Sequence, residues 1–148
     1  MGNRTRILVI CQHNSGRSQM AEAYIRKFGG DRVHVESAGL EPAEKLNPLV
    51  LDVMKEDGFD LSQATTQSVF ELFKQGKLFE HVITVCHDGE NKCPIFPGIT
   101  KRWHWPFPDP AAVEGNREER LEKVMHIRDM IKERIAESKT DDFSLDRL

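Results

Sequence analysis

Four short segments of the chain are typical of β-strands. The first contains the continuous run Ile7-Leu8-Val9-Ile10, and an unbroken apolar run is typical of a strand buried on both faces of a parallel sheet. In the second, Val33 and Val35 alternate with polar residues, which favours a strand with one buried face. The predicted strands are residues 6–10, 33–37, 81–85 and 101–105.

Between these strands, apolar residues recur at helical spacing. Asn47-Pro48 has the form of a helix cap followed by proline in the first turn, and Ser68 with Glu71 has the form of a capping box. The predicted helices are residues 18–28, a helix from Pro48 that ends before Gly58, a helix after Ser68, and residues 117–137, with residues 87–94 at best a weak helix. Their predicted buried positions are Met20, Ala21, Tyr24, Ile25, Phe28, Leu49, Val50, Val53, Met54, Val69, Leu72, Phe73, Leu121, Val124, Ile127, Ile131 and Ile135.

Strands that alternate with helices predict an α/β fold, a doubly wound, four-stranded parallel sheet flanked by helices with right-handed crossovers. At 148 residues the chain can bury roughly 70% of its unfolded surface. We therefore expect a single domain, residues 1–148.

Composition narrows the classes of partner. The formal net charge is −3 with both signs mixed, so a nucleic-acid partner is not expected. Only four apolar residues precede Cys11, too few for a signal peptide or a membrane span, and we expect a cytoplasmic monomer with no membrane contact. Three cysteines in such a chain favour reactive thiols over a disulfide framework.

The stretch CQHNSGRS, residues 11–18, joins the first strand to the first helix. A turn of small polar residues at this position directs backbone N–H groups and a helix N-terminus toward an anion. The same environment stabilises a thiolate, so we expect Cys11 to be a nucleophile. The predicted oxyanion-binding residues are Gln12, His13, Asn14, Ser15, Gly16 and Arg17.

Three residues at the end of this loop have distinct expected roles. The planar guanidinium of Arg17 can hold two oxygens of a tetrahedral oxyanion. Gly16 gives the backbone room to turn. Ser18 can donate its hydroxyl to the Cys11 sulfur, and a helix N-cap is the alternative role, which does not exclude the first.

This loop resembles the Cys-x5-Arg-Ser loop of the low-molecular-weight protein tyrosine phosphatase superfamily, which includes the thioredoxin-coupled arsenate reductases. The resemblance extends to Ser37-Ala38-Gly39 and covers nearly the whole chain. It implies the strand order 2-1-3-4 and an arsenate- or phosphate-like oxyanion as substrate.

Asp109, between Pro108 and Pro110, is a second candidate catalytic residue. Taken alone, the Asp-Pro pair indicates a turn. The resemblance implies that Asp109 is the general acid that protonates the leaving oxygen.

Cys86 follows the third predicted strand, and Cys93 follows seven residues later. Because ligands bind at the carboxyl ends of parallel strands, Cys86 can lie near Cys11. Burial as small apolar residues is one alternative, and zinc binding with His87 and His104 is another, although Cys-x6-Cys is not a usual zinc spacing. The resemblance implies a redox relay of Cys11, Cys86 and Cys93 that thioredoxin regenerates, with no metal at the site and no tightly bound cofactor.

Two positions depart from the resembled proteins. Many of the reductases have an aspartate that contributes to a potassium site where this chain has Gln67, although Asn14, Glu22 and Ser37 remain. The phosphatases have a tyrosine after Asp-Pro where this chain has Ala111. The first departure argues against potassium dependence, and the second argues against a phosphatase.

The resemblance and its two departures together imply an arsenate reductase that produces arsenite. A phosphotyrosine phosphatase is the alternative enzyme, and an oxyanion-binding or redox-sensing module without turnover is the alternative from another class.

Overall fold

The computed structural model describes residues 4–86 and 101–138. Cys93, His87 and the expected weak helix at residues 87–94 lie outside this part of the chain. Four parallel strands form the sheet, in the order β2-β1-β3-β4, which confirms the expected class and strand order. The strands are β1 (Thr5–Cys11), β2 (Val33–Gly39), β3 (His81–Thr84) and β4 (Lys101–His104).

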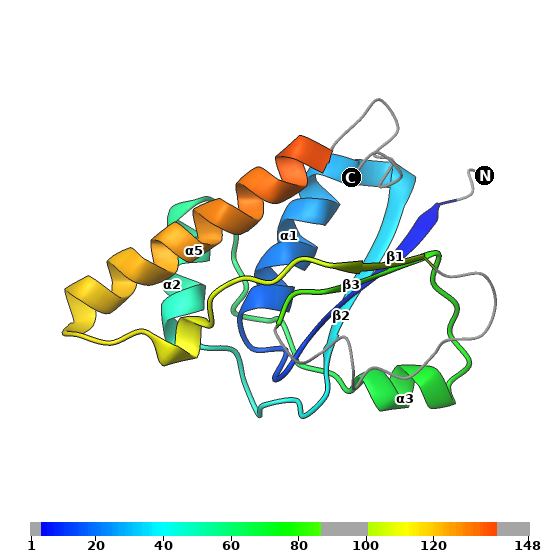
Figure 1. The fold of residues 1–148 in the computed structure, drawn as a ribbon, viewed down its shortest axis with the longest axis horizontal. Helices are drawn as coiled ribbons and strands as arrows, with labels where there is room; N and C mark the ends of the chain where they lie inside the picture. Colours follow the sequence, from blue (N-terminus) through cyan, green and yellow to red (C-terminus); the bar gives the residue numbers. More distant parts are fainter. Residues whose placement is uncertain (1–3, 87–100, 139–148) are drawn as a thin grey trace.

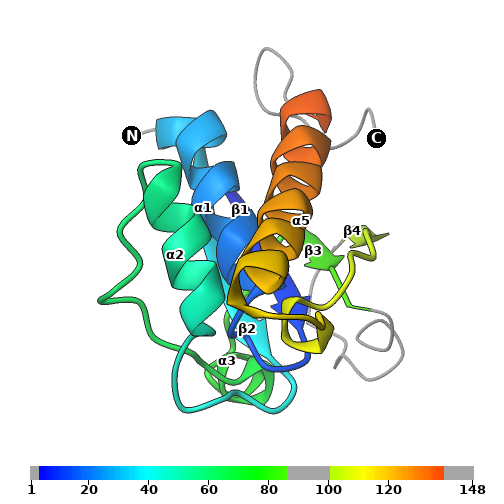
Figure 2. The ribbon, with the colours of Figure 1, turned by 90° about the vertical axis from the view of Figure 1, so that its left-hand side faces the viewer.

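The described helices cover both faces of the sheet. The α-helices are α1 (Arg17–Gly29), α2 (Pro48–Glu56), α3 (Val69–Lys74) and α5 (Arg117–Ser138), and two short 3-10 turns are η1 (Gly30–Arg32) and η2 (Pro110–Ala112). Helices α1, α2 and α5 lie on one side of the strands and α3 lies on the other (Figure 1). In Figure 2, α1 lies between α2 and α5 in front of the strands.

Successive residues of β1 contribute to different halves of the core. Ile7 and Val9 belong to the cluster built with α1, α2 and α5, whereas Leu8 and Ile10 pack with Leu72 of α3 in a second cluster. Both faces of β1 are therefore covered, which explains its unbroken apolar run.

The helix caps follow the sequence signals at two of three positions. The side chains of Asn47 and Ser68 accept hydrogen bonds from backbone N–H groups at the starts of α2 and α3. Ser18 does not cap α1, because the cap position is Gly16 and Ser18 is already the second helical residue. The N-cap role for Ser18 is therefore wrong.

One predicted core position is also wrong. Phe73 of α3 is 41% exposed, whereas Val69 and Leu72 are buried. A six-residue helix buries one narrow side, and consecutive residues lie about 100° apart around it. Val69 and Leu72 occupy that side, so Phe73 faces outward.

Among the residues that the structure describes, no helix is long and apolar enough to cross a membrane.

Candidate functional site

The site begins where β1 ends. Cys11 is the last residue of β1, and α1 starts at Arg17, so the cysteine loop, residues 11–17, joins a buried strand to a helix N-terminus. β1 pairs with both β2 and β3. The loop therefore starts from a strand held on both sides.

A neighbouring segment, residues 40–47, fixes the direction of the loop's peptide groups. Its backbone N–H groups donate to four loop carbonyls. The pairs are Leu40 to Cys11, Glu41 to Gln12, Ala43 to His13 and Asn47 to Ser15, at 3.1, 2.8, 2.9 and 2.9 Å. Because the C=O and N–H of a peptide unit point in opposite directions, these bonds turn loop N–H groups toward the interior of the loop.

The Cys11 sulfur lies inside this loop and is buried. The backbone N–H of Asn14 donates to the sulfur at 3.2 Å. The Ser18 hydroxyl oxygen lies 3.0 Å from the same atom. Two hydrogen-bonding groups therefore contact the Cys11 sulfur.

Asn14 holds the loop together from within. It is fully buried, and its φ of 53° lies in the left-handed region, which asparagine tolerates better than most residues. Its side-chain oxygen accepts from the backbone N–H of Gln67 at 2.9 Å, which fixes the orientation of the amide. The amide nitrogen then donates to the hydroxyls of Ser18 and Ser37, at 2.8 and 2.9 Å.

Two further residues, for which no local sequence pattern predicts a role, support the loop. Gln19 donates its side-chain amide to the carbonyl of Asn14 at 3.0 Å. Gly39 lies so close to the loop that an added Cβ would be 2.9 Å from the Asn14 nitrogen. The only sequence signals are the Gln after Arg-Ser and the Gly that ends Ser-Ala-Gly.

Arg17 and Asp109 close the other side of the loop. The buried Arg17 guanidinium donates to the Phe107 carbonyl at 3.1 Å, and its Nη2 lies 3.8 Å from the Asp109 carboxylate. Asp109 also accepts from the backbone N–H of Ala111 at 2.9 Å, as the cap of η2. Asp109 therefore occupies a turn, and its carboxylate lies beside the guanidinium of Arg17.

A small cavity of about 20 Å³, here called the cradle, lies within this arrangement. Its walls are Cys11, His13, Ser15, Gly16, Arg17, Asn47, Asp109, Pro110 and Ala111. The side chains of Gln12 and His13 bond outward to Glu41. The structure therefore brings Cys11, Arg17 and Asp109 to one cavity, whereas Gln12 does not line it.

Cys86 lies at the same edge of the sheet as Cys11. The Val85 N–H donates to the Ile10 carbonyl at 2.9 Å, which extends the pairing of β1 with β3 toward the two cysteines. Both cysteines are buried and belong to the same core cluster, and neither is in a disulfide among the described residues. Cys93 lies outside the part of the chain that the structure describes.

The oxygens that would surround a potassium ion behind the loop already accept hydrogen bonds. The Ser37 carbonyl accepts from the Gln67 side-chain amide at 2.9 Å, and Glu22 accepts from the Ser37 hydroxyl and from Arg26. These oxygens already have N–H and O–H donors. A cation would have to displace those donors, since it needs several free oxygen ligands.

No group of three or more His, Cys, Asp or Glu side chains suited to a metal ion occurs in residues 4–86 and 101–138.

The carboxylate of Glu36, which lies next to Gln67, is held in its ionised form. Glu36 accepts from Lys77 at 3.2 Å and from Gln67 at 3.4 Å, and His34 lies 3.0 Å away. Burial by itself raises the pKa of Glu36, but the hydrogen bonds from His34, Lys77 and Gln67 outweigh it, so the pKa lies below its usual value. The negative charge at Glu36 is therefore part of the folded structure.

The parallel sheet thus places a cysteine at the end of β1 and an arginine at the start of the next helix. The chain belongs to the low molecular weight phosphotyrosine protein phosphatase family, whose model matches residues 6–139.

Members of this family with high similarity to the chain include arsenate reductases. An arsenate reductase of Bacillus licheniformis is 43% identical over 130 residues, which is 87% of this chain and 91% of that protein. A structure described as an arsenate reductase in oxidized state has a TM-score of 0.77 at 27% identity and covers 95% of this chain and 99% of that one. A thioredoxin-dependent arsenate reductase of Corynebacterium glutamicum has a TM-score of 0.61 at 32% identity, over 89% of this chain and 62% of that one.

Proposed function

We propose that this protein reduces arsenate to arsenite by a thiol relay that starts at Cys11. The observation that carries the proposal is the buried Cys11 sulfur, 3.2 Å from the Asn14 nitrogen and 3.0 Å from the Ser18 hydroxyl, in a chain 43% identical to an arsenate reductase.

In the first step, the Cys11 thiolate attacks the arsenic atom of arsenate. Backbone N–H groups of the loop and the Arg17 guanidinium hold the arsenate oxygens and stabilise their charge. Asp109 gives a proton to the departing hydroxide, which leaves as water. The product is a covalent adduct between the Cys11 sulfur and arsenic.

In the second step, the Cys86 thiolate attacks the Cys11 sulfur. A disulfide forms between the two cysteines and the sulfur–arsenic bond breaks. The electron pair of that bond stays on arsenic, which is reduced from As(V) to As(III) and leaves as arsenite. The burial of both cysteines in one cluster supports this step.

In the third step, the Cys93 thiolate attacks the sulfur of Cys86. A Cys86–Cys93 disulfide forms and Cys11 is released as a thiolate. A dithiol reductant of the thioredoxin class then reduces this disulfide. The thioredoxin-dependent relative supports that choice of reductant.

The decisive experiment is arsenite production from arsenate with thioredoxin, thioredoxin reductase and NADPH. We expect the wild-type chain to oxidise one NADPH for each arsenite formed. Cys86→Ser and Cys93→Ser should each stop arsenite production and leave any hydrolysis of p-nitrophenyl phosphate, because the cradle remains intact. Wild-type turnover in both variants would rule out the relay.

Phosphotyrosine hydrolysis is the second candidate, because the same thiolate, arginine and aspartate can cleave a phosphate monoester. Membership of the low molecular weight phosphotyrosine protein phosphatase family supports this candidate. Of the three cysteines, only Cys11 should be essential for that activity. A phosphatase would show fast hydrolysis that survives Cys86→Ser and Cys93→Ser, and the wild type would form no arsenite. A redox sensor would show reversible oxidation of its thiols with no turnover of either substrate.

A further inference from the structure

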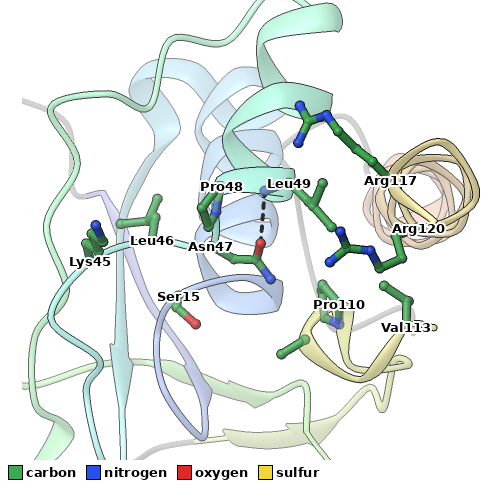
Figure 3. Close-up of a pocket in the computed structure, with 11 residues that line it drawn as sticks. Ser15, Lys45, Leu46, Asn47, Pro48, Leu49, Pro110, Val113, Arg117 and Arg120 are labelled. Carbon is green, nitrogen blue, oxygen red and sulfur yellow. Dashed lines mark hydrogen bonds between the residues drawn. The ribbon is translucent and has the colours of Figure 1, made fainter. Parts of the chain in front are cut away.

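A groove of about 570 Å³ opens beside the cradle. It lies between the start of α2, the η2 turn and the start of α5 (Figure 3). Four residues line both the groove and the cradle, namely Ser15, Asn47, Pro110 and Ala111. The two cavities are therefore neighbours, and one molecule can occupy both.

Three cations line the groove, and no described carboxylate does. These cations are Lys45, Arg117 and Arg120. Arg117 is paired with Asp52 at 2.7 Å, whereas Lys45 and Arg120 form no ion pair with the described residues. The groove is thus a site of unbalanced positive charge in a chain whose net charge is −3.

Arg120 is the strongest indication that the groove binds an anion. Its Nε atom is buried and has no hydrogen-bond partner among residues 4–86 and 101–138. The side chain extends from α5 toward α2, and its guanidinium lies between Leu49 and Pro110 (Figure 3). A buried donor of a charged group without a partner is costly. Because Arg120 lines the groove, an anion there would offset part of this cost by pairing with the charge of the guanidinium.

The rest of the groove suits a carbon skeleton. Its apolar lining consists of Leu46, Pro48, Leu49, Pro110 and Val113. A cavity of this size, with apolar walls and a few convergent polar groups, is typical of small-molecule sites. The small side chain of Ala111 lines both cavities, so nothing bulky at this position separates the groove from the cradle.

We propose that the groove binds the carbon skeleton and the second anionic group of a small organic phosphate, whose phosphate group occupies the cradle. The second group pairs with Arg120, and Lys45 and Arg117 add to the attraction. The proposal rests on the oxyanion role of the cradle in the proposed function, and it is independent of the thiol relay.

Two non-hydrolysable probes test the proposal, phenylphosphonate and its carboxylated analogue 4-(carboxymethyl)phenylphosphonate. Isothermal titration calorimetry of each probe with the reduced wild-type chain measures the contribution of the second anion. We expect the carboxylated probe to bind about tenfold more tightly, which corresponds to about 1.4 kcal/mol.

Variants of Arg120 test whether this residue causes the tighter binding of the carboxylated probe. Arg120→Ala should abolish the advantage of the carboxylated probe and leave phenylphosphonate binding unchanged. Arg120→Gln, which keeps hydrogen-bond donors without the charge, should retain part of it. Lys55→Ala is the matched control, since it removes an exposed positive charge from α2 outside the groove, and it should keep the full advantage.

Three results would overturn the proposal. Equal affinity of the wild type for the two probes would show that the groove does not select an anion. An unchanged preference in both Arg120 variants would show that another residue selects it. If neither probe displaces bound inorganic phosphate, the groove proposal fails while the cradle assignment stands. If inorganic phosphate itself does not bind the reduced chain, the cradle assignment is wrong and the proposed function fails with it.

Discussion

The hydroxyl oxygen of Ser18 lies 3.0 Å from the sulfur of Cys11, and both residues are buried. Either atom could in principle donate the proton. However, the Asn14 amide already donates to the Ser18 oxygen at 2.8 Å, which leaves the hydroxyl proton for the sulfur. Asn14 thus makes Ser18 a donor to Cys11, and the Ser18 hydroxyl stabilises the thiolate.

Ser18→Ala should therefore slow reactions of the Cys11 thiol. A hydrogen bond to a charged group contributes about 1.5–3 kcal/mol, so we expect a fall of about 10- to 100-fold in alkylation of Cys11 by iodoacetamide at pH 7. Mass spectrometry of the labelled peptide measures this rate, and circular dichroism checks the fold. An alkylation rate equal to that of the wild type would contradict the donor role.

Arg17→Lys should be severe even though the positive charge remains. The Arg17 guanidinium bonds the Phe107 carbonyl at 3.1 Å and lies 3.8 Å from Asp109, so its plane is fixed at the edge of the cradle. A lysine ammonium is a point charge that cannot hold two oxygens in one plane. We expect kcat/KM for arsenate to fall by at least about 100-fold, measured by coupled NADPH oxidation. A fall of less than threefold would show that charge alone suffices.

The sequence predicts the elements whose pattern is local. The run Ile7-Leu8-Val9-Ile10 predicts a buried strand, and β1 is covered on both faces. Asn47 and Ser68 predict helix starts, and both cap their helices. The prediction that Phe73 is buried is wrong, because the buried side of a six-residue helix is too narrow for three apolar residues.

The contacts that hold the cysteine loop in place join residues far apart in the sequence, so no local pattern predicts them. The bond from Gln67 to Asn14 joins residues 53 positions apart, and it orients the amide that in turn orients Ser18. Gly39 matters because of its close approach to the loop rather than its own conformation. Such relationships follow from how β2 and the following segment pack against the loop.

Potassium should have no specific effect on the wild-type chain, and Gln67→Asp should create one. The substitution removes the donor to the Ser37 carbonyl and places a second carboxylate near Glu36. We expect the melting temperature of Gln67→Asp to rise in potassium chloride relative to choline chloride at equal ionic strength, because a cation can bind the freed oxygens. Wild-type protein serves as the control. A specific stabilisation of the wild type by potassium would show that its oxygens are available to a cation after all.

The pH dependence of stability offers a test at Glu36, whose side chain is only 15% exposed. The pKa of Glu36 is lowered on folding: burial raises it, and the hydrogen bonds from His34, Lys77 and Gln67 lower it by more. Its stabilising contribution is therefore complete above the unfolded value of about 4.5 and is lost as the pH falls through the folded pKa. Glu36→Gln should lower the free energy of unfolding by about 1 kcal/mol at pH 7 and by progressively less below pH ~4.

Urea unfolding of wild type and Glu36→Gln across pH 3–8 measures this difference. Glu71→Gln is the matched control, since Glu71 and Lys74 form an ion pair whose side chains are 62% and 74% exposed. Such an exposed pair contributes about 0–1 kcal/mol, and salt screens it. We expect the control to follow the wild-type curve closely, while Glu36→Gln converges on that curve only at low pH. A deficit at Glu36 that stays constant down to pH 3 would mean that the lost stability comes from packing rather than from the carboxylate charge.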